Sequence, residues 1–440
     1  LYLIGCVNEI GKRQKADNIS GLLREPSLEE YVSSKSKNNI TGYFMQIGID
    51  DFEEINGRFG LKCGDEILKQ FSRCMQSCIN ENQKIYELGN GRFMIMDLEN
   101  HSKEDILELY DELKKSVEVA LEENAYRIVY TISVGIVEID KEIQDYDTLI
   151  KYSEFALNEA KKKGKNSCYF FTHDKYRQFI RRREIRVELQ NAVDHNFKNF
   201  DVYYQPIIDI HTRNLIGAEA LMRFKMKRNE QIEFVSPAEF IPILEESGLI
   251  IPAGRWILRQ AVACCKKWQE FIPKFKMNVN LSYVQIIKSG ILDEIKQALK
   301  DYNLKPALLG IEVTETGYLE NTYHYKKLWS SLKEEGITLI LDDYGTGYSN
   351  AYRLSDLTPN YIKIDRVLTQ KALSSNYERS ILIYIIEMAH SLKLNVCIEG
   401  VETEEELQEI KKLNPDYIQG YLFGKPAPED EFYNRQIKKK

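Results

Sequence analysis

The sequence predicts an α/β protein with two parts: an α/β domain built on a mixed sheet, followed by a TIM-like (β/α)8 barrel. The chain has 440 residues, which exceeds the usual size of a single domain. Its first part mixes strand and helix patterns, whereas its second part alternates eight short apolar runs with helical stretches. Eight such repeats in about 260 residues match the size of a barrel. A doubly wound open sheet is the alternative fold.

In the first part, a strand is expected at residues 40–50 and a helix at 64–78, where apolar side chains follow the i, i+3, i+4 and i+7 spacing. Two β-prone runs within 84–96 are joined by an Asn-Gly pair, which is a strong hairpin signal. A helix, a strand and a second helix are expected at 103–122, 126–139 and 148–164. Mixed strands with a few helices indicate an α/β domain.

The second part supplies the strands of the barrel. They are expected at 202–208, 215–224, 276–282, 309–315, 338–344, 361–365, 395–401 and 417–423. Helical patterns such as 289–302 and 378–394 lie between them. The expected boundaries are a linker helix at 1–14, the first domain at 15–173, a linker helix at 174–192 and the barrel at 193–440, or about 178–437 for the barrel domain with its leading helix.

Composition excludes several functions. The net charge of −7 argues against binding a nucleic acid polymer, which relies on clustered Lys and Arg. No apolar run reaches the roughly 18 residues of a membrane helix. We expect a cytoplasmic protein that continues before Leu1, where an unknown sensor or a membrane anchor would lie. Because Cys and His form no metal-binding pairs, the ligands of any metal ion are expected to be oxygen atoms.

Polar side chains lie in or just after seven of the eight predicted strands. They are Glu219, Asn280, Glu312, Asp342 with Asp343, Lys363, Glu399 and Gln419. In a barrel, the C-terminal ends of the strands meet at the face where active sites are built. Carboxylates gathered there would raise one another's pKa unless a cation neutralised them. An all-oxygen set favours Mg²⁺, Mn²⁺ or Ca²⁺ over zinc.

The adjacent acids Asp342 and Asp343 indicate the chemistry. Asp342 is expected to end its strand and Asp343 to begin the turn, so that both reach the mouth of the barrel. Such a pair suggests a bridge between two cations, which together activate a water molecule and stabilise a leaving oxygen in phosphoryl displacement. The following glycine-rich residues, 345–350, only partly match GxGxxG, so we expect a mobile loop over the site and no dinucleotide cofactor.

A family resemblance covers the second part. Its motifs, in order, are EALMRF (219–224), VNLS (279–282), IEVTET (311–316), DDYGTGYSN (342–350), IKID (362–365), EGVET (399–403) and QGYLFGKP (419–426). They resemble those of EAL-domain phosphodiesterases, which open cyclic di-GMP to linear pGpG. The resemblance implies two Mg²⁺ or Mn²⁺ ions per site, no organic cofactor and a homodimer formed through the EAL domain. Phe224 and Tyr344 depart from the usual Trp and Phe.

The resemblance also implies a role for each site residue. One metal ion would be held by Glu219, Asn280, Glu312 and Asp342, and the second by Asp342, Asp343 and Glu399. The catalytic set would be Lys363, which polarises the attacking water, with Glu399, Gln419 beside the water, and Glu315, which anchors the loop. Cyclic di-GMP would contact Gln205, Leu221 and Arg223, whose guanidinium suits a phosphate.

The first part resembles the GGDEF diguanylate cyclase domain. Its motifs are DNISGLLR (17–24), IGIDDFEEIN (47–56), GLKCGDEIL (60–68), ELGNGRF (87–93) and ALNEAKKKGKN (156–166). By this resemblance, Gly91 and Arg92 replace a metal-binding acid and its neighbour, and Gly48 replaces the first Asp of a DxD pair. The inhibitory RxxD motif would fall at Asn80 and Gln83 and is absent. We therefore expect a degenerate, regulatory domain.

Two alternatives remain open. A non-enzymatic cyclic di-GMP receptor or scaffold would bind the same ligand without cleavage, although such receptors usually lack acids that this sequence retains. The first domain would bind GTP weakly if the positions of Asn56 and Asp65 suffice without metal ligands.

Overall fold

The computed structural model describes residues 16–35, 41–99, 101–122, 128–140, 143, 145–228, 230–314, 322–345 and 358–438. The chain forms two compact units, Leu1–Ile180 and Arg181–Lys440. Helix α7 (His173–Asp194) contributes residues to both units. The linker helix predicted at 1–14 lies outside the described residues.

The first unit is built on a six-stranded mixed sheet. Its strand order is β1 (Leu23–Arg24), β3 (Lys84–Gly89), β4 (Arg92–Asp97), β2 (Gly42–Ile49), β5 (Ile132–Ile139) and β6 (Cys168–Phe170). The two outer pairs are parallel and the inner pairs are antiparallel. Asn90 and Gly91 connect β3 to β4 with φ angles of 52° and 68°, as a tight hairpin turn requires. The predicted hairpin and mixed sheet are confirmed.

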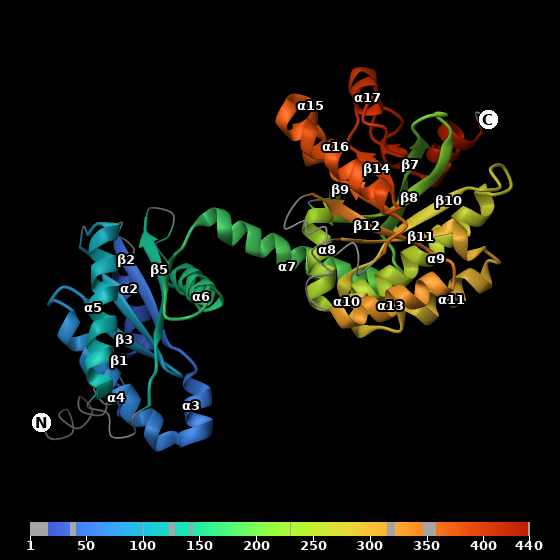
Figure 1. The fold of residues 1–440 in the computed structure, drawn as a ribbon. Coiled ribbons are helices and arrows are strands. Elements are labelled where there is room, and N and C mark those ends of the chain that lie inside the picture. The colour runs from blue at the N-terminus through green and yellow to red at the C-terminus, as the bar shows by residue number, and fades with distance from the viewer. Residues whose placement is uncertain are drawn as a thin grey trace, which may run out of the picture. The chain divides into compact units, whose positions relative to one another are not determined.

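Helices cover both faces of this sheet (Figure 1). One face packs against α3 (Phe52–Phe59), α4 (Leu61–Cys78) and α5 (Lys103–Glu122), and the other against α2 (Glu25–Lys35) and α6 (Tyr146–Lys162). Strand β2 contributes to both cores because its side chains alternate: Met45 and Ile47 enter the first, whereas Phe44 enters the second.

The second unit contains a closed barrel of eight strands. They are β7 (Phe200–Asp209), β8 (Leu215–Arg228), β10 (Lys276–Asn280), β11 (Leu309–Thr314), β12 (Thr338–Tyr344), β13 (Tyr361–Ile364), β14 (Asn395–Glu399) and β15 (Tyr417–Gln419). Each strand from β8 to β15 pairs in parallel with the next, and β7 closes the ring by pairing with both β15 and β8. All eight predicted strands are present, which confirms the TIM-like barrel.

The first strand departs from the predicted βα repeat. Strand β7 is antiparallel to both of its neighbours, and no helix separates it from β8. The connection, residues 210–214, is too short for the crossover that a parallel pair needs, so the two strands form a hairpin. Two further strands, β9 (Gln231–Val235) and β16 (Ala427–Pro428), extend the sheet beside β8 and β7.

Helices surround the barrel. They are α8 (Pro237–Ser247), α9 (Ile250–Trp268), α10 (Tyr283–Lys288), α11 (Ile291–Asp301), α13 (Thr322–Glu334), α15 (Arg366–Ser374), α16 (Asn376–Ser391), α17 (Glu404–Lys411) and α18 (Glu429–Phe432). Outward-facing strand residues pack on them, whereas Ile207, Ile340, Tyr361 and Cys397 form a small separate cluster.

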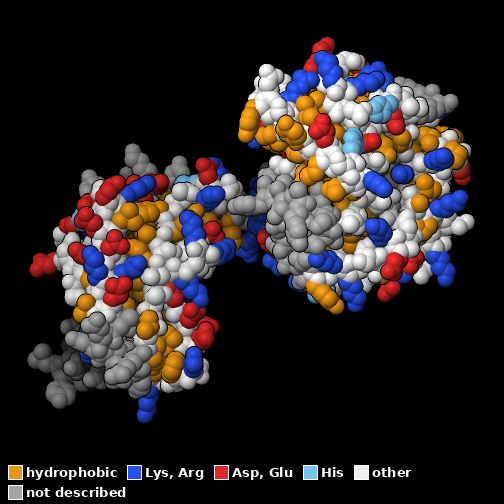
Figure 2. Space-filling view, in the orientation of Figure 1, with side chains coloured by type: hydrophobic (Ala, Val, Ile, Leu, Met, Phe, Trp, Pro, Cys, Tyr) orange, Lys and Arg blue, Asp and Glu red, His pale blue; other side chains and the backbone are white. Residues whose placement is uncertain are grey.

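The surface of each unit mixes acidic and basic side chains with scattered hydrophobic ones (Figure 2). None of the helices in the described part of the chain combines the length and apolarity needed to cross a lipid bilayer.

Candidate active site

The candidate site lies at the C-terminal ends of the barrel strands, one layer above the small apolar cluster. Because side chains alternate along a strand, residues two positions apart face the same side. Asp342, Lys363 and Glu399 each lie two residues after a member of that cluster, namely Ile340, Tyr361 and Cys397. The alternation therefore carries these charged side chains to the same face of the barrel wall as the apolar layer beneath them.

A β-bulge brings Asp342 and Asp343 together. Leu341 pairs with Ile362 and Tyr344 pairs with Ile364, so two residues of β12 lie opposite the single residue Lys363 of β13. Asp343 takes the left-handed conformation, with φ 57°. The expectation that the strand ends at Asp342 is therefore wrong, because β12 continues to Tyr344. The bulge, and not a strand end, lets adjacent side chains approach one site.

Lys363 is the centre of the acidic cluster and is only 1% exposed. Its Nζ lies 2.7 Å from Glu399 Oε1, 2.9 Å from Glu219 Oε2, 3.0 Å from Glu312 Oε2 and 3.4 Å from Asp342 Oδ1. One ammonium group thus faces four carboxylates, so its single positive charge leaves the cluster strongly negative.

Amide side chains fix the orientation of the acids. Asn280 Nδ2 donates to Glu219 Oε1 at 2.7 Å, and Gln419 Nε2 donates to Glu219 Oε2 at 2.8 Å. Gln419 Nε2 also lies 3.0 Å from Gln205 Oε1. Asn280 and Gln419 therefore orient Glu219 directly, and Gln205 does so through Gln419.

Burial shifts the pKa values of the carboxyl groups. It raises the pKa of Glu399 to about 8, and burial together with Asp342 raises that of Asp343 to about 6. Burial and the charge of Glu219 raise the pKa of Glu312 well above its usual value. Burial opposes ionisation of Glu219 too, but Lys363 outweighs it and lowers the pKa. The cluster therefore binds protons more readily than free carboxylates do.

The acids form two groups that could each hold a metal ion. Glu219, Glu312 and Asp342 offer oxygens within 4.8 Å of one another, and so do Asp342, Asp343 and Glu399. Both groups include Asp342. Carboxylate and amide oxygens are the ligands that Mg²⁺ and Mn²⁺ prefer, so the donor set fits these ions.

A cavity of about 630 Å³ adjoins the acids. Leu221 and Arg223, both predicted to contact substrate, line it together with Asn280 and Glu312. The Arg223 guanidinium carbon lies 5.5 Å from the centre of the Tyr203 ring, and burial lowers the pKa of Arg223. The cavity is large enough for a ligand of several hundred Å³. Glu315 and residues 346–350 of the predicted loop lie outside the described residues.

Two residues beneath the site, Asn278 and Tyr361, were missed by the sequence analysis. Asn278 is 1% exposed, and its Nδ2 donates to Glu312 Oε1 at 2.8 Å and contacts Tyr361 Oη at 2.5 Å. The signal was present: Asn278 lies two positions before Asn280 in an otherwise apolar strand, and therefore on the same face.

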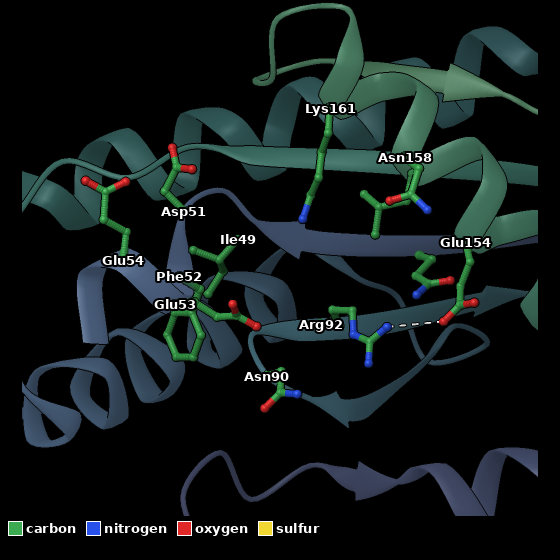
Figure 3. Close-up of a pocket in the computed structure, with 12 residues that line it drawn as sticks. Ile49, Asp51, Phe52, Glu53, Glu54, Asn90, Arg92, Glu154, Asn158 and Lys161 are labelled. Carbon is green, nitrogen blue, oxygen red and sulfur yellow. Dashed lines mark hydrogen bonds and ion pairs between the residues drawn. The ribbon is translucent and has the colours of Figure 1, made fainter. Parts of the chain in front are cut away.

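The first unit contains a larger cavity, of about 730 Å³, lined by residues of β2, β4, α3 and α6 (Figure 3). Arg92 lies in it and pairs with Glu154 at 3.1 Å. A Cβ atom at Gly91 would lie 2.7 Å from the Phe52 ring. The nearby Asp50 carboxylate accepts hydrogen bonds from the hydroxyls of Thr131 and Ser133 and from the backbone N–H of Asn166.

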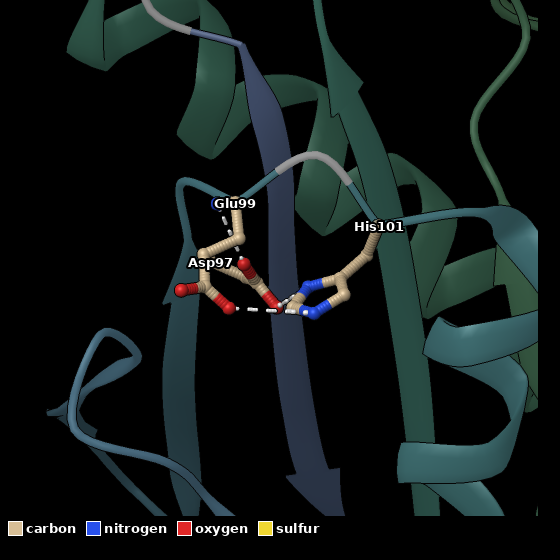
Figure 4. Close-up of side chains that lie close together, drawn as sticks. All are labelled: Asp97, Glu99 and His101. Atoms are coloured by element: carbon tan, nitrogen blue, oxygen red, sulfur yellow. Dashed lines mark hydrogen bonds and ion pairs between the residues drawn. The ribbon is translucent and has the colours of Figure 1, made fainter.

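The positions expected for the inhibitory motif lie beside a third group of side chains, Asp97, Glu99 and His101 (Figure 4). Asp97 is fully buried, and its Oδ2 lies 2.6 Å from Gln83 Nε2 and 2.8 Å from His101 Nδ1. Asn80 Nδ2 lies 3.5 Å from Glu99 Oε2. Gln83 and His101 therefore give the buried Asp97 carboxylate hydrogen-bond partners within the protein.

Comparison with family models matches both units. The EAL domain model covers residues 186–426, and the model described as diguanylate cyclase, GGDEF domain, covers 15–167. The signaling protein YkoW of Bacillus subtilis is 29% identical over 399 residues, 90% of this chain and 48% of that protein. The cyclic di-GMP phosphodiesterase PdeR of Escherichia coli is 26% identical over 429 residues, 96% of this chain and 64% of that protein.

Solved structures resemble the second unit. The structure of the PaMucR phosphodiesterase in complex with c-di-GMP has a TM-score of 0.53 and 28% identity, and the match covers 57% of this chain and 99% of that one. The FimX EAL domain of Pseudomonas aeruginosa bound to c-di-GMP has a TM-score of 0.50 and 26% identity, with coverage of 55% and 96%. The chain spans 48% of YkoW and 64% of PdeR.

Proposed function

Because the chain belongs to the EAL domain family, we propose that its second unit is a metal-dependent phosphodiesterase that hydrolyses cyclic di-GMP to linear pGpG. The observation that carries this proposal is the pair of carboxylate groups sharing Asp342 beside the 630 Å³ cavity. The names of the relatives support the substrate: PdeR is called a cyclic di-GMP phosphodiesterase, and PaMucR is described in complex with c-di-GMP.

In this proposal, Glu219, Asn280, Glu312 and Asp342 would hold one Mg²⁺ or Mn²⁺ ion, and Asp342, Asp343 and Glu399 the other. Bound divalent ions supply an activated water and stabilise the leaving oxygen. The surplus of carboxylates over the single Lys363 ammonium favours these cations, since otherwise the buried acids must take up protons.

The protein's own groups would orient the reaction. Arg223 lies in the cavity wall with a guanidinium that suits a phosphate of the substrate, and Leu221 would contact a nucleotide. Lys363 would polarise the attacking water, with Gln419 beside it. Gln205, which is hydrogen-bonded to Gln419, would contact the substrate too. Glu315 would anchor the loop after Asp343.

The first unit would be a regulator without cyclase activity. Gly91 offers no metal ligand, and the arginine that follows it pairs with Glu154. Asp50, the acid that the resemblance leaves in the DxD pair, already accepts hydrogen bonds from Thr131 and Ser133. The two positions that the resemblance assigns to metal-binding acids, Gly48 and Gly91, therefore offer no carboxylate to the two cations that a triphosphate reaction needs.

The test is chromatography of the products formed from cyclic di-GMP by the purified chain, with Mg²⁺ or Mn²⁺ and with EDTA. We expect pGpG only in the presence of metal, and none from Asp342→Ala. Intact cyclic di-GMP in saturating metal, together with measurable binding, would instead identify a receptor. Equal cleavage by wild type and Asp342→Ala would contradict the assignment of the site.

A further inference from the structure

A cavity of about 400 Å³ lies at the base of the barrel. Its lining includes the first residues of four parallel strands, Lys276 of β10, Thr338 of β12, Tyr361 of β13 and Asn395 of β14. Parallel strands begin at one end of a barrel and finish at the other. The cavity is therefore separate from the acidic site at the C-terminal ends of the same strands.

All of the charged residues that are described in the lining of this cavity are basic. Three lysines line it, Lys276, Lys333 and Lys393, and none of the described lining residues is acidic. Lys333 Nζ lies 3.1 Å from the Thr358 hydroxyl. Within the described residues, the ammonium groups of Lys276 and Lys393 make no hydrogen bond or ion pair. A basic cavity is unexpected in a chain with a net charge of −7.

The positions of two of these lysines are explained by the C-terminal ends of helices. Lys333 lies in the last turn of α13, and Lys393 closely follows the end of α16, where backbone carbonyls favour a positive charge. Lys276 has no such explanation because it begins a strand. Its side chain is partly buried, and burial lowers the pKa of its ammonium group. A partly buried charge without a partner costs free energy, which an anion would offset.

We propose that this cavity binds a small phosphate-bearing anion between Lys276, Lys333 and Lys393. Neutral donors complete the site. Asn360 Oδ1 accepts from the Leu339 amide at 2.7 Å, which leaves the Asn360 NH₂ group available to an oxyanion. The Thr338 hydroxyl is also in the lining. Ammonium groups and neutral donors together are a common set for phosphate oxygens.

Calorimetric titration of the whole chain tests this site. The probes are inorganic phosphate, pyrophosphate and adenosine 5′-monophosphate, in EDTA so that no metal ion at the acidic site can hold them. Salt is kept at about 0.15 M to screen nonspecific attraction. We expect saturable binding that is about tenfold weaker in Lys276→Gln, as loss of one charge-assisted contact implies. Binding of the inorganic ions would identify a free anion, and binding of the nucleotide alone would identify a nucleotide phosphate.

Two further variants keep the result interpretable. Lys371→Gln removes an exposed lysine of α15, outside this cavity, and should bind like wild type. Lys393→Gln changes an exposed residue, so it should fold even if Lys276→Gln does not, and it should also bind more weakly. Circular dichroism checks folding. Absence of saturable binding for all three probes, or equal binding by wild type and Lys393→Gln, would overturn the proposal.

Discussion

Asn278 donates a hydrogen bond of 2.8 Å to Glu312 Oε1 from the layer beneath the acidic cluster. Both side chains are almost fully buried. The Asn278 amide therefore fixes Glu312 Oε1, while Glu312 Oε2 faces Lys363. Glu312 is a metal ligand in the proposed site, and its orientation therefore depends on a residue that touches neither the cavity nor the substrate.

Asn278→Leu should weaken metal binding and slow cleavage. It leaves Glu312 Oε1 buried without a donor, which costs about 1–3 kcal/mol and favours the protonated acid. Titration with Mn²⁺ followed by calorimetry measures the loss. Met277→Leu is the matched control, because the neighbouring Met277 faces the outer core and the exchange conserves volume. Equal Mn²⁺ affinity in wild type and Asn278→Leu would contradict the supporting role.

The barrel strands could be predicted because each is a short apolar run between helical patterns, and β12 matches its predicted range, 338–344. The direction of β7 was missed, although the short connection to β8 carried that signal. The bulge at Asp343 could not be predicted, because strict alternation places adjacent residues on opposite faces and only pairing with β13 reveals the extra residue. Asn278 was missed because a single buried amide in a strand resembles an ordinary core position.

Lys363→Met should destabilise the metal-free protein by about 3–5 kcal/mol, because it removes the only cation that contacts Glu219, Glu312 and Glu399 among the described residues. Urea denaturation in EDTA measures this change. Mg²⁺ should restore more stability to the variant than to wild type, since bound cations replace the missing charge. A variant as stable as wild type in EDTA would contradict this prediction, because it would show that protonation of the acids alone removes the repulsion between them.

Metal affinity should rise with pH between about 6 and 8. In the metal-free protein the pKa of Asp343 is raised to about 6 and that of Glu399 to about 8. At low pH both carboxyls carry protons that a metal ion must displace, so binding weakens as pH falls through these values. Calorimetry in buffers of different ionisation enthalpy counts the protons released. No proton release at pH 7 would contradict the raised pKa of Glu399.

Asp343→Asn should remove one of two bound ions and keep the fold. Asn tolerates the left-handed conformation that Asp343 adopts at φ 57°, so the bulge should survive while one charged ligand of the second group is lost. We expect Mn²⁺ stoichiometry to fall from two to one, with cleavage strongly reduced. Asp343→Val is the contrasting variant, since a β-branched side chain is strained at this φ and should also lower stability. Two ions bound to Asp343→Asn would assign the second site to other residues.

Gly91→Asp in the first unit should fail to create a cyclase. The residue has φ 68°, and its added Cβ would lie 2.7 Å from the buried Phe52 ring, so we expect a loss of about 1–3 kcal/mol from overpacking and strain. Adding Arg92→Glu would break the pair with Glu154, yet Gly48 would still lack a carboxylate. Incubation of each variant with GTP and Mg²⁺, followed by chromatography, should show no cyclic di-GMP. Its formation by the single variant would mean that the domain needs only one restored acid, and that its inactivity depends on Gly91 alone.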